Sequence, residues 1–327
     1  MDDQEQFPPA CVKEVPSDDP AWLPAVVASR GPAARFAFEE FLHGQIRNLH
    51  TRKAYLHAVR LFCGWCEREG LDLTQVTPAH VGRYLDGLAV GVPTRKLHLA
   101  ALRRFFDALV LRHVVVLNPA ISVRGERYQV LEGRTPEISI VDARKLLQSV
   151  STEHVVGLRD RAIIGILIYT AARVGAVAGL QRGNFYCVGD QYCLRFHEKG
   201  GKVREIPVRH DLQQYLLAYL ATGGQIASPS DAPLFRTALR RTRRLTDRPM
   251  TADDMSRMLK RRLRDAGLSQ RLSPHSFRVT TITDLLAQGV PLEDVQYLAG
   301  HVDPRTTRLY DRRRRQVTRN IVERISI

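Results

Sequence analysis

Residues 273–310, SPHSFRVTTITDLLAQGVPLEDVQYLAGHVDPRTTRLY, carry polar side chains at regular positions on helical patterns. His275 and Arg278 are three residues apart at the expected start of a helix, where they share a face beside backbone N–H groups that attract anions. His301 and Tyr310 follow, nine residues apart across a short turn that contains proline. Alone, the pair His275 and Arg278 is typical of a solvated helix surface, and Tyr310 is typical of a side chain that packs between helices. Together, in the most basic part of the chain, they indicate an anion-binding site.

The rest of the C-terminal half is predicted to be mostly helical with one short strand region. The segment QYCLRFHEKGGKVREIPV, residues 191–208, alternates in polarity around a Lys-Gly-Gly-Lys turn, which is typical of a β-hairpin. Helical patterns cover residues 140–150, 158–174, 209–221, 251–266 and 291–299, and a further helix is expected after Pro274. We therefore expect residues 138–327 to form one mixed α/β domain that ends in a basic tail.

The N-terminal half shows helical patterns only, over residues 33–120. They run through RFAFEEFLHGQIR, from Thr51 to about Glu69, from a Thr77 cap with Pro78 in the first turn, and from Thr94 through LHLAALRRFFDALVL. These patterns predict a compact all-helical domain. Residues 121–137 have no amphipathic period and contain two glycines and one proline, so we expect a linker there.

The chain begins with an acidic segment. Residues 1–20 hold six acidic residues and one lysine, with little periodicity. Such a composition cannot bury enough apolar surface to offset the entropy of ordering. We therefore expect residues 1–32 to be a flexible acidic leader.

The charge of the whole chain points to a polyanionic partner. Its 327 residues include 49 Lys and Arg against 34 Asp and Glu, a formal net charge of +15, and residues 236–327 hold 21 basic against 10 acidic residues. A positive field of this size favours nucleic acid, with an anionic membrane surface as the second possibility. The sequence has no run of about 18 apolar residues and no secretion signal, so we expect a cytoplasmic protein with no membrane partner.

The cysteines predict neither a disulfide framework nor a metal site. Five cysteines in an intracellular chain of this length are not a disulfide pattern. Cys63 and Cys66 form one CxxC pair, but no second pair completes a ligand set. Because Tyr55, Val59, Phe62 and Cys66 recur at helical spacing, we interpret Cys66 as a small core residue and expect no metal and no cofactor.

Several basic residues are candidates for contact with DNA phosphates. Four lie on the helix expected from Thr94, where such a face is either solvated or bound to phosphate. One more is the second lysine of the hairpin turn, and four lie in the basic run that follows. The complete set is Arg95, Lys96, Arg103, Arg104, Lys202, Arg240, Arg241, Arg243 and Arg244.

Six residues, in order, resemble the site of a known enzyme family. They are Arg173 in YTAARVGAVAGL, Lys199 in HEKGGKVREIPV, His275 and Arg278 in SPHSFR, His301 in AGH and Tyr310 in TTRLY. In residue type, order and spacing they are similar to the tyrosine recombinase (phage integrase, Xer-like) family. The likeness covers residues 135–327 as a catalytic domain, and residues 33–120 look like the family's SAM-like core-binding domain.

Three positions differ from the family pattern. Ala176 stands where an acidic residue is common, Phe277 where leucine is usual, and Val279 where His or Lys is frequent. None of these changes removes a core functional group. Since the usual carboxylate is missing at position 176, we expect a different partner to orient Arg173.

The resemblance implies a mainly α fold with a small β-sheet, in which the two domains form a C-shaped clamp around double-stranded DNA. It implies that Tyr310 is the nucleophile of a site-specific recombinase that forms a 3′-phosphotyrosyl intermediate. Arg173, Arg278, His275 and His301 would then bind and activate the phosphate, and Lys199 would be the general acid. By the same resemblance a homotetramer synapses two DNA sites without metal or ATP, alone or with a second recombinase or accessory protein.

Two alternatives remain at this point. A type IB-like DNA topoisomerase shares the Arg, Lys, His and Tyr chemistry, although the separate helical module and the short basic tail favour a recombinase. The second is a DNA-binding protein that has lost catalysis, against which the intact set of six residues argues.

Overall fold

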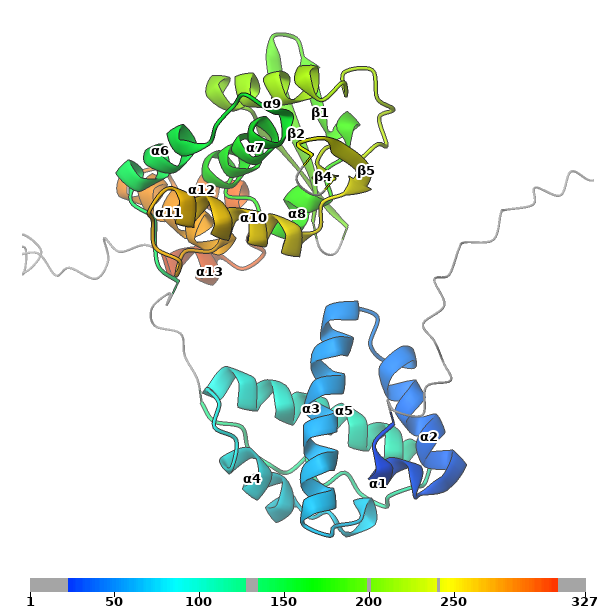
Figure 1. Ribbon diagram of the computed structural model, residues 1–327. Helices are drawn as coiled ribbons and strands as arrows, with labels where there is room; N and C mark the ends of the chain where they lie inside the picture. The colour runs from blue at the N-terminus through cyan, green and yellow to red at the C-terminus, as the bar shows by residue number, and fades with distance from the viewer. Residues whose placement is uncertain (1–22, 128–134, 199–200, 240–241, 311–327) are drawn as a thin grey trace, which may run out of the picture. The chain divides into compact units, whose positions relative to one another are not determined.

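The structure is a computed structural model that describes residues 23–127, 135–198, 201–239 and 242–310. Lys199, Arg240, Arg241, most of the predicted acidic leader and the basic tail from residue 311 lie outside these described residues. The chain divides into two compact units, Met1–Gln129 and Val130–Ile327, shown in Figure 1.

The N-terminal unit is helical in all of its described elements. These are α1 Ala25–Ala28, α2 Gly31–Glu39, the π-helical turn η2 Glu40–Gly44, α3 Leu49–Arg68, the 3-10 turn η3 Leu73–Gln75, α4 Pro78–Asp86 and α5 Val92–Leu111. The long helices α3 and α5 pack together around an aromatic core. Phe62 and Phe106 meet at 5.9 Å between ring centroids, and so do Phe38 and Phe105.

Local sequence signals account for the helix ends in this unit. Asn48 caps α3 by accepting from the backbone N–H groups of His50 and Thr51. The predicted Thr77 cap is confirmed, because the Thr77 hydroxyl accepts from the N–H of His80 in a capping box.

The CxxC pair lies inside the core of the N-terminal unit. Cys63 and Cys66 on α3 are both fully buried, and burial raises the pKa of the Cys66 thiol to about 12. The interpretation of Cys66 as a core residue is therefore confirmed. Among the residues that the structure describes, no group of His, Cys, Asp and Glu side chains could hold a metal ion.

The ends of the N-terminal unit differ from the sequence prediction. Helix α1 lies within the predicted leader, residues 1–32, because Val26 and Val27 bury apolar side chains in the core and the N–H of Val26 donates to Glu67 at 3.1 Å. At the other end, the start of the predicted linker, residues 121–137, is held on α5. There the Arg103 guanidinium donates to the carbonyl oxygens of Ala120 and Val123.

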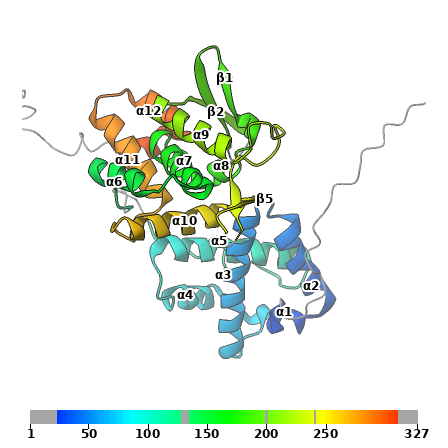
Figure 2. The same ribbon diagram turned by 45° about the horizontal axis from the view of Figure 1, so that its top comes forward.

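The C-terminal unit is a mixed α/β domain. Its elements are α6 Ile140–Ser149, α7 Val155–Tyr169, α8 Val174–Ala178, η4 Arg182–Asn184, β1 Phe185–Val188, β2 Gln191–Glu198, β3 Lys202–Pro207, α9 His210–Thr222, β4 Arg236–Ala238, β5 Leu245–Pro249, α10 Ala252–Asp265, α11 Pro274–Ala287, α12 Leu292–Ala299 and α13 Pro304–Arg308. Helix α7 is buried along most of its length and contacts α6, α8, α9, α10 and α11, which surround it in Figures 1 and 2.

The predicted hairpin is confirmed, and the structure adds strands that the sequence did not predict. Strands β2 and β3 pair antiparallel with Glu198 opposite Lys202. Strand β1 extends this sheet to three strands, and β4 pairs with β5 in a second sheet of two. The prediction of a single strand region is thus wrong. Strands β4 and β5 are short and half-exposed, so their residues show no alternation of polarity that would mark them.

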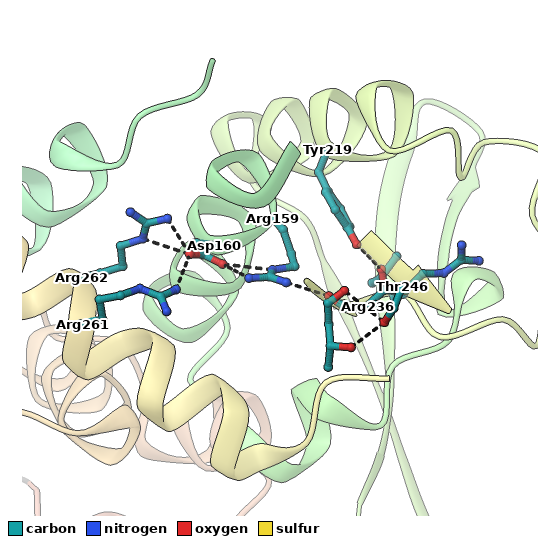
Figure 3. Close-up of polar contacts among 9 residues, drawn as sticks. Arg159, Asp160, Tyr219, Arg236, Thr246, Arg261 and Arg262 are labelled. Carbon is teal, nitrogen blue, oxygen red and sulfur yellow. Dashed lines mark hydrogen bonds and ion pairs between the residues drawn. The ribbon is translucent and has the colours of Figure 1, made fainter. Parts of the chain in front are cut away.

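A buried carboxylate joins α7, α10 and β4, as Figure 3 shows. Asp160 on α7 is fully buried. Its Oδ2 accepts from Arg262 on α10 at 2.7 Å, and its Oδ1 accepts from Arg159 at 2.7 Å. Arg159 in turn donates to the carbonyl oxygen of Arg236 at 2.8 Å. Since a buried ion pair is strongly destabilising to break, this network fixes α10 against the core.

None of the described helices is both long enough and apolar enough to cross a membrane.

Candidate active site

Arg173 reaches the site because α7 ends early. The helix was expected to continue to residue 174 but stops at Tyr169. There the Thr170 hydroxyl donates back to the carbonyl oxygen of Ile166 at 2.7 Å, and Ala171 adopts a left-handed φ of 49°.

 This turn carries Arg173 to the position before α8, where its side chain is 50% exposed. An arginine held at such a turn presents its guanidinium to solvent and to an anion.

The carboxylate that orients Arg173 comes from the sheet. Nη1 of Arg173 donates to Oε2 of Glu198, the last residue of β2, at 3.1 Å. Nη2 also faces the carbonyl oxygen of Gly300 at 3.4 Å. The expectation that a partner other than residue 176 holds Arg173 is therefore confirmed, since Ala176 packs against the core from α8.

Arg278 forms the buried floor of the site. It lies in the first turn and a half of α11, which begins after the Ser273 cap, and its side chain is almost completely buried. Its guanidinium donates to the carbonyl oxygens of Ala171 and, at 2.5 Å, Ala299. Burial, with Arg173 and Arg204 nearby, lowers the pKa of Arg278 to about 10, so the group is still charged at neutral pH.

Two departures from the family pattern are explained by packing around Arg278. Phe277 and Val279 are both buried, and Phe277 belongs to the main core of the unit. An apolar side chain fits both positions because each is buried.

The two histidines differ in their surroundings. His275 is exposed at the start of α11, and partial desolvation, with Arg278 and Arg173 nearby, lowers its pKa. His301 is buried, and its Nδ1 lies 2.9 Å from the hydroxyl oxygen of Thr307. Burial, reinforced by Arg278 and Arg173, lowers the pKa of His301 to about 3, so this imidazole is neutral at pH 7.

Tyr310 lies against His301. The two rings stack at 6.0 Å between centroids and 8° between planes. Tyr310 also packs on a small apolar cluster that includes Ala171, Ile282 and Val295. Burial raises the pKa of the Tyr310 hydroxyl, while Arg278 and Arg173 act in the opposite direction. The phenol is thus protonated at rest but surrounded by positive charge that would stabilise a phenolate.

The structure brings together five of the six predicted site residues: Arg173, His275, Arg278, His301 and Tyr310. The sixth, Lys199, lies outside the described residues, although Glu198 before it contacts Arg173 and Lys202 after it lines a hollow with His301. The roles of all six stay predictions.

Two charged residues of the site were not predicted from the sequence, Glu198 on β2 and Arg204 on β3. The side chain of Arg204 is 5% exposed, and its Nη2 donates to Oε1 of Glu198 at 2.9 Å. The signal for Arg204 was available, because it lies two residues before the apolar Ile206, on the same face of β3. With Arg173, Arg204 and Arg278 set against Glu198, the site keeps a net positive charge suited to a phosphodiester.

We expect acid to destabilise the C-terminal unit through His301. Its pKa in the folded protein is about 3, below the ordinary value of about 6.5, so the unfolded state takes up the proton first as the pH falls. The stability is present in full above about pH 7 and is lost as the pH falls through 6.5 toward 3. Between pH 7.5 and pH 5 this loss is about 2 kcal/mol. Urea unfolding at both pH values measures it.

His301→Asn is the control for this titration, because it keeps a polar side chain but cannot take up the proton. The free energy of unfolding of the variant should fall by about 2 kcal/mol less than that of the wild type over the same interval. Equal losses in the two proteins would mean that His301 titrates normally.

The predicted DNA-contacting residues fall into two groups. Arg95 is paired with Glu126 at 2.6 Å, and Arg103 donates to backbone carbonyl oxygens, while the contact of both with DNA stays a prediction. Lys96, Arg104, Lys202 and Arg244 are exposed. Arg243 is exposed too and contacts His154. Arg240 and Arg241 lie outside the described residues.

Helix α10 carries a basic face that the candidate set did not include. Arg257, Arg261 and Arg264 are exposed and, with Lys260, line one hollow. The opposite face of α10 is buried through Met255, Met258, Leu259 and Leu263. The sequence held this signal, since basic residues recur between apolar ones at helical spacing.

Comparison with known proteins places the chain in a family. The model described as "Phage integrase family" matches residues 140–316. The model described as "Phage integrase, N-terminal SAM-like domain" matches residues 37–113.

Relatives and solved structures agree with these matches. Tyrosine recombinase XerC of Vibrio atlanticus is 27% identical over 296 residues, which cover 88% of this chain and 90% of the relative. Tyrosine recombinase XerC of Azotobacter vinelandii is 30% identical over 272 residues, covering 80% and 84%. The fold is similar to that of XerH site-specific recombinase bound to a palindromic difH substrate, with a TM-score of 0.68, 18% identity and coverage of 84% and 81%. It is also similar to a lambda integrase tetramer bound to a Holliday junction, with a TM-score of 0.60, 17% identity and coverage of 85% and 80%.

The family model for the catalytic domain spans more than half of the chain. It includes Arg173 and Tyr310, the first and the last of the residues on which the predicted site rests. The chain therefore belongs to the phage integrase family and is a tyrosine site-specific recombinase.

Proposed function

We propose that the chain cleaves double-stranded DNA with Tyr310 and rejoins it to a second DNA site. The observation that carries this proposal is the position of Tyr310, stacked on His301 in the field of Arg278 and Arg173. The Tyr310 oxygen attacks the scissile phosphorus, and the bond from phosphorus to the 5′ oxygen breaks. The product is a 3′-phosphotyrosyl bond that retains the energy needed for rejoining.

The cationic groups of the site bind the phosphate and stabilise the transition state. Arg173 is half-exposed, so its guanidinium can also donate to an oxygen of the incoming phosphate. Arg278 is held in place by two backbone carbonyl oxygens, those of Ala171 and Ala299. Preorganised donors of this kind typically contribute about 10²- to 10³-fold each to the rate. His275 and neutral His301 add N–H donors beside them. The leaving 5′ oxygen takes its proton from Lys199.

The DNA interface extends beyond the phosphate that is cleaved. We assign residues 33–120 as the core-binding domain and residues 138–327 as the catalytic domain, and we propose that each of them contacts the duplex. The exposed arginines of α10 support a DNA contact by the catalytic domain, because Asp160 and Arg262 fix their helix to the core of that unit. Basic side chains that neutralise DNA phosphates release counterions, so the affinity for DNA would fall steeply as the salt concentration rises.

The assembly that exchanges strands is proposed to be a homotetramer on two synapsed sites, acting in the cytoplasm. The similarity in fold to the lambda integrase tetramer on a Holliday junction supports it. The reaction then uses no ATP and no metal, and a second recombinase or an accessory protein remains compatible with it.

A nicked duplex tests the proposed function. The nick lies in the cleaved strand, a short distance 3′ of the scissile phosphate, so cleavage releases a short strand with the 5′ hydroxyl, and the enzyme cannot rejoin and stays covalently attached to DNA. We expect an adduct that survives denaturing electrophoresis, forms equally in EDTA, and transfers its strand to a second duplex with a free 5′ hydroxyl. Because a topoisomerase adduct could also pass its strand to a 5′ hydroxyl, reciprocal exchange between two intact sites is measured as well, and an adduct without such exchange would indicate a topoisomerase. Binding without any adduct would indicate a DNA-binding protein. A requirement for Mg²⁺ in cleavage would contradict the mechanism.

A further inference from the structure

Glu198 is the one carboxylate that contacts two arginines of the described site. Its side chain is 7% exposed. Oε2 accepts from Arg173 at 3.1 Å, and Oε1 accepts from Arg204 at 2.9 Å. Both oxygens are thus used, each by a different guanidinium.

The two arginines differ in how firmly they are held. The side chain of Arg204 is 5% exposed, and its guanidinium lies over the Phe196 ring at 5.3 Å from the centroid. The side chain of Arg173 is 50% exposed. Arg204 and Glu198 are buried, whereas Arg173 faces solvent. The contact with Glu198 therefore anchors Arg173 to the buried end of the network.

The backbone around Gly300 is shaped to admit this carboxylate. Gly300 ends α12 with a left-handed φ of 61°. A Cβ atom at this position would lie 2.5 Å from Oε2 of Glu198, so only glycine leaves the space. The same residue offers its carbonyl oxygen to Arg173 at 3.4 Å. Glu198 and Gly300 therefore form one cradle for the Arg173 guanidinium.

We propose that Glu198 is the positioning residue of Arg173, supplied by β2 in place of a carboxylate at position 176. Glu198 sets the Arg173 fork in the geometry that grips a phosphate oxygen, and it separates Arg173 from the like charge of Arg204. Without its charge, Arg173 loses the ion pair and can turn toward solvent. This proposal rests on the proposed function of the site.

The test measures single-turnover formation of the covalent adduct on the nicked duplex, together with half-site affinity and thermal unfolding. Glu198→Gln should slow adduct formation about 10- to 100-fold, less than the roughly 10²- to 10³-fold cost of removing a whole transition-state donor, and change affinity less than about threefold. Glu198→Asp keeps the charge but withdraws it by one methylene group. Its rate of adduct formation should lie between those of the wild type and Glu198→Gln. An unchanged rate in Glu198→Gln overturns the proposal.

Glu205→Gln is the matched control. Glu205 lies on β3 of the same sheet and also pairs with an arginine, Arg195, at 2.7 Å, but this pair is exposed. The change removes the same charge from a similar ion pair away from the site. It should leave the rate of adduct formation within about twofold of wild type, because exposed pairs contribute little.

A double-mutant cycle shows whether Glu198 acts through Arg173. If it does, Glu198→Gln should add almost nothing to the defect of Arg173→Ala, because the group it positions is already gone. Defects that multiply would mean that Glu198 has a separate structural effect. The cycle remains informative if the single variant is less stable, provided that rates are compared per folded protein by thermal unfolding.

The neighbouring general acid needs its own control, because Lys199 follows Glu198 in the chain. A duplex with sulfur in place of the bridging 5′ oxygen does not need the acid. The defect of Glu198→Gln should persist on this substrate, and its disappearance would assign Glu198 to Lys199 instead. If the wild type formed no adduct, the proposed function would be contradicted. If the wild type and Glu198→Gln formed the adduct equally fast, only the role of Glu198 would be contradicted.

Discussion

Tyr310→Phe should abolish the covalent adduct on a nicked duplex and leave DNA affinity within a few-fold of wild type. The substitution removes only the hydroxyl oxygen that would attack phosphorus. The ring keeps its stacking on His301 and its place in the apolar cluster of Ala171 and Val295, so the local fold is preserved. Denaturing electrophoresis of the labelled duplex measures the adduct, and a gel-shift titration measures the affinity.

Tyr297→Phe is the matched control, because Tyr297 on α12 lines a hollow with His301 and is 66% exposed. This variant should form the adduct at the wild-type rate. An adduct that persisted in Tyr310→Phe would show that another residue is the nucleophile, and Tyr297 would be the first to test.

Local patterns in the sequence were sufficient for much of the fold. The Thr77 cap, the β2–β3 hairpin and the helix after Pro274 were predicted because each depends on residues close in sequence. The early end of α7 was not predicted. Apolar residues continue through Ala171 and Ala172, and only the turn at Thr170 and the left-handed Ala171 stop the helix.

Contacts between distant residues could not be predicted in the same way. The sequence indicated that Arg173 lacked its usual carboxylate, but it did not reveal Glu198, which is 25 residues away and arrives through the pairing of β2 with β3. Similarly, charge alone did not distinguish Arg103, which binds backbone carbonyls, from its exposed neighbour Arg104. A basic residue can serve the fold or the ligand, and its neighbours in space decide which.

Lys199→Ala should slow cleavage of normal DNA by about 10²- to 10⁴-fold, the usual contribution of a general acid. The 5′ oxygen is a poor leaving group unless it receives a proton as its bond to phosphorus breaks. Sulfur at that position leaves as a thiolate without a proton. The same variant should therefore cleave the sulfur-bridged duplex at close to the wild-type rate, as measured by single-turnover adduct formation on both substrates.

Lys202→Ala is the control that assigns the acid, because the hairpin offers two lysines and only one can lie at the leaving oxygen. Lys202 is exposed at the start of β3, opposite Glu198 in the strand register, which suits a phosphate contact. Its loss should slow cleavage of the normal and the sulfur-bridged duplex modestly and to the same extent, since a phosphate contact does not depend on the leaving atom. Sulfur rescue of Lys202→Ala instead of Lys199→Ala would exchange their roles. Rescue of neither would place the acid elsewhere, with His275 as the next residue to substitute, because its exposed imidazole lies beside Arg278 and Arg173.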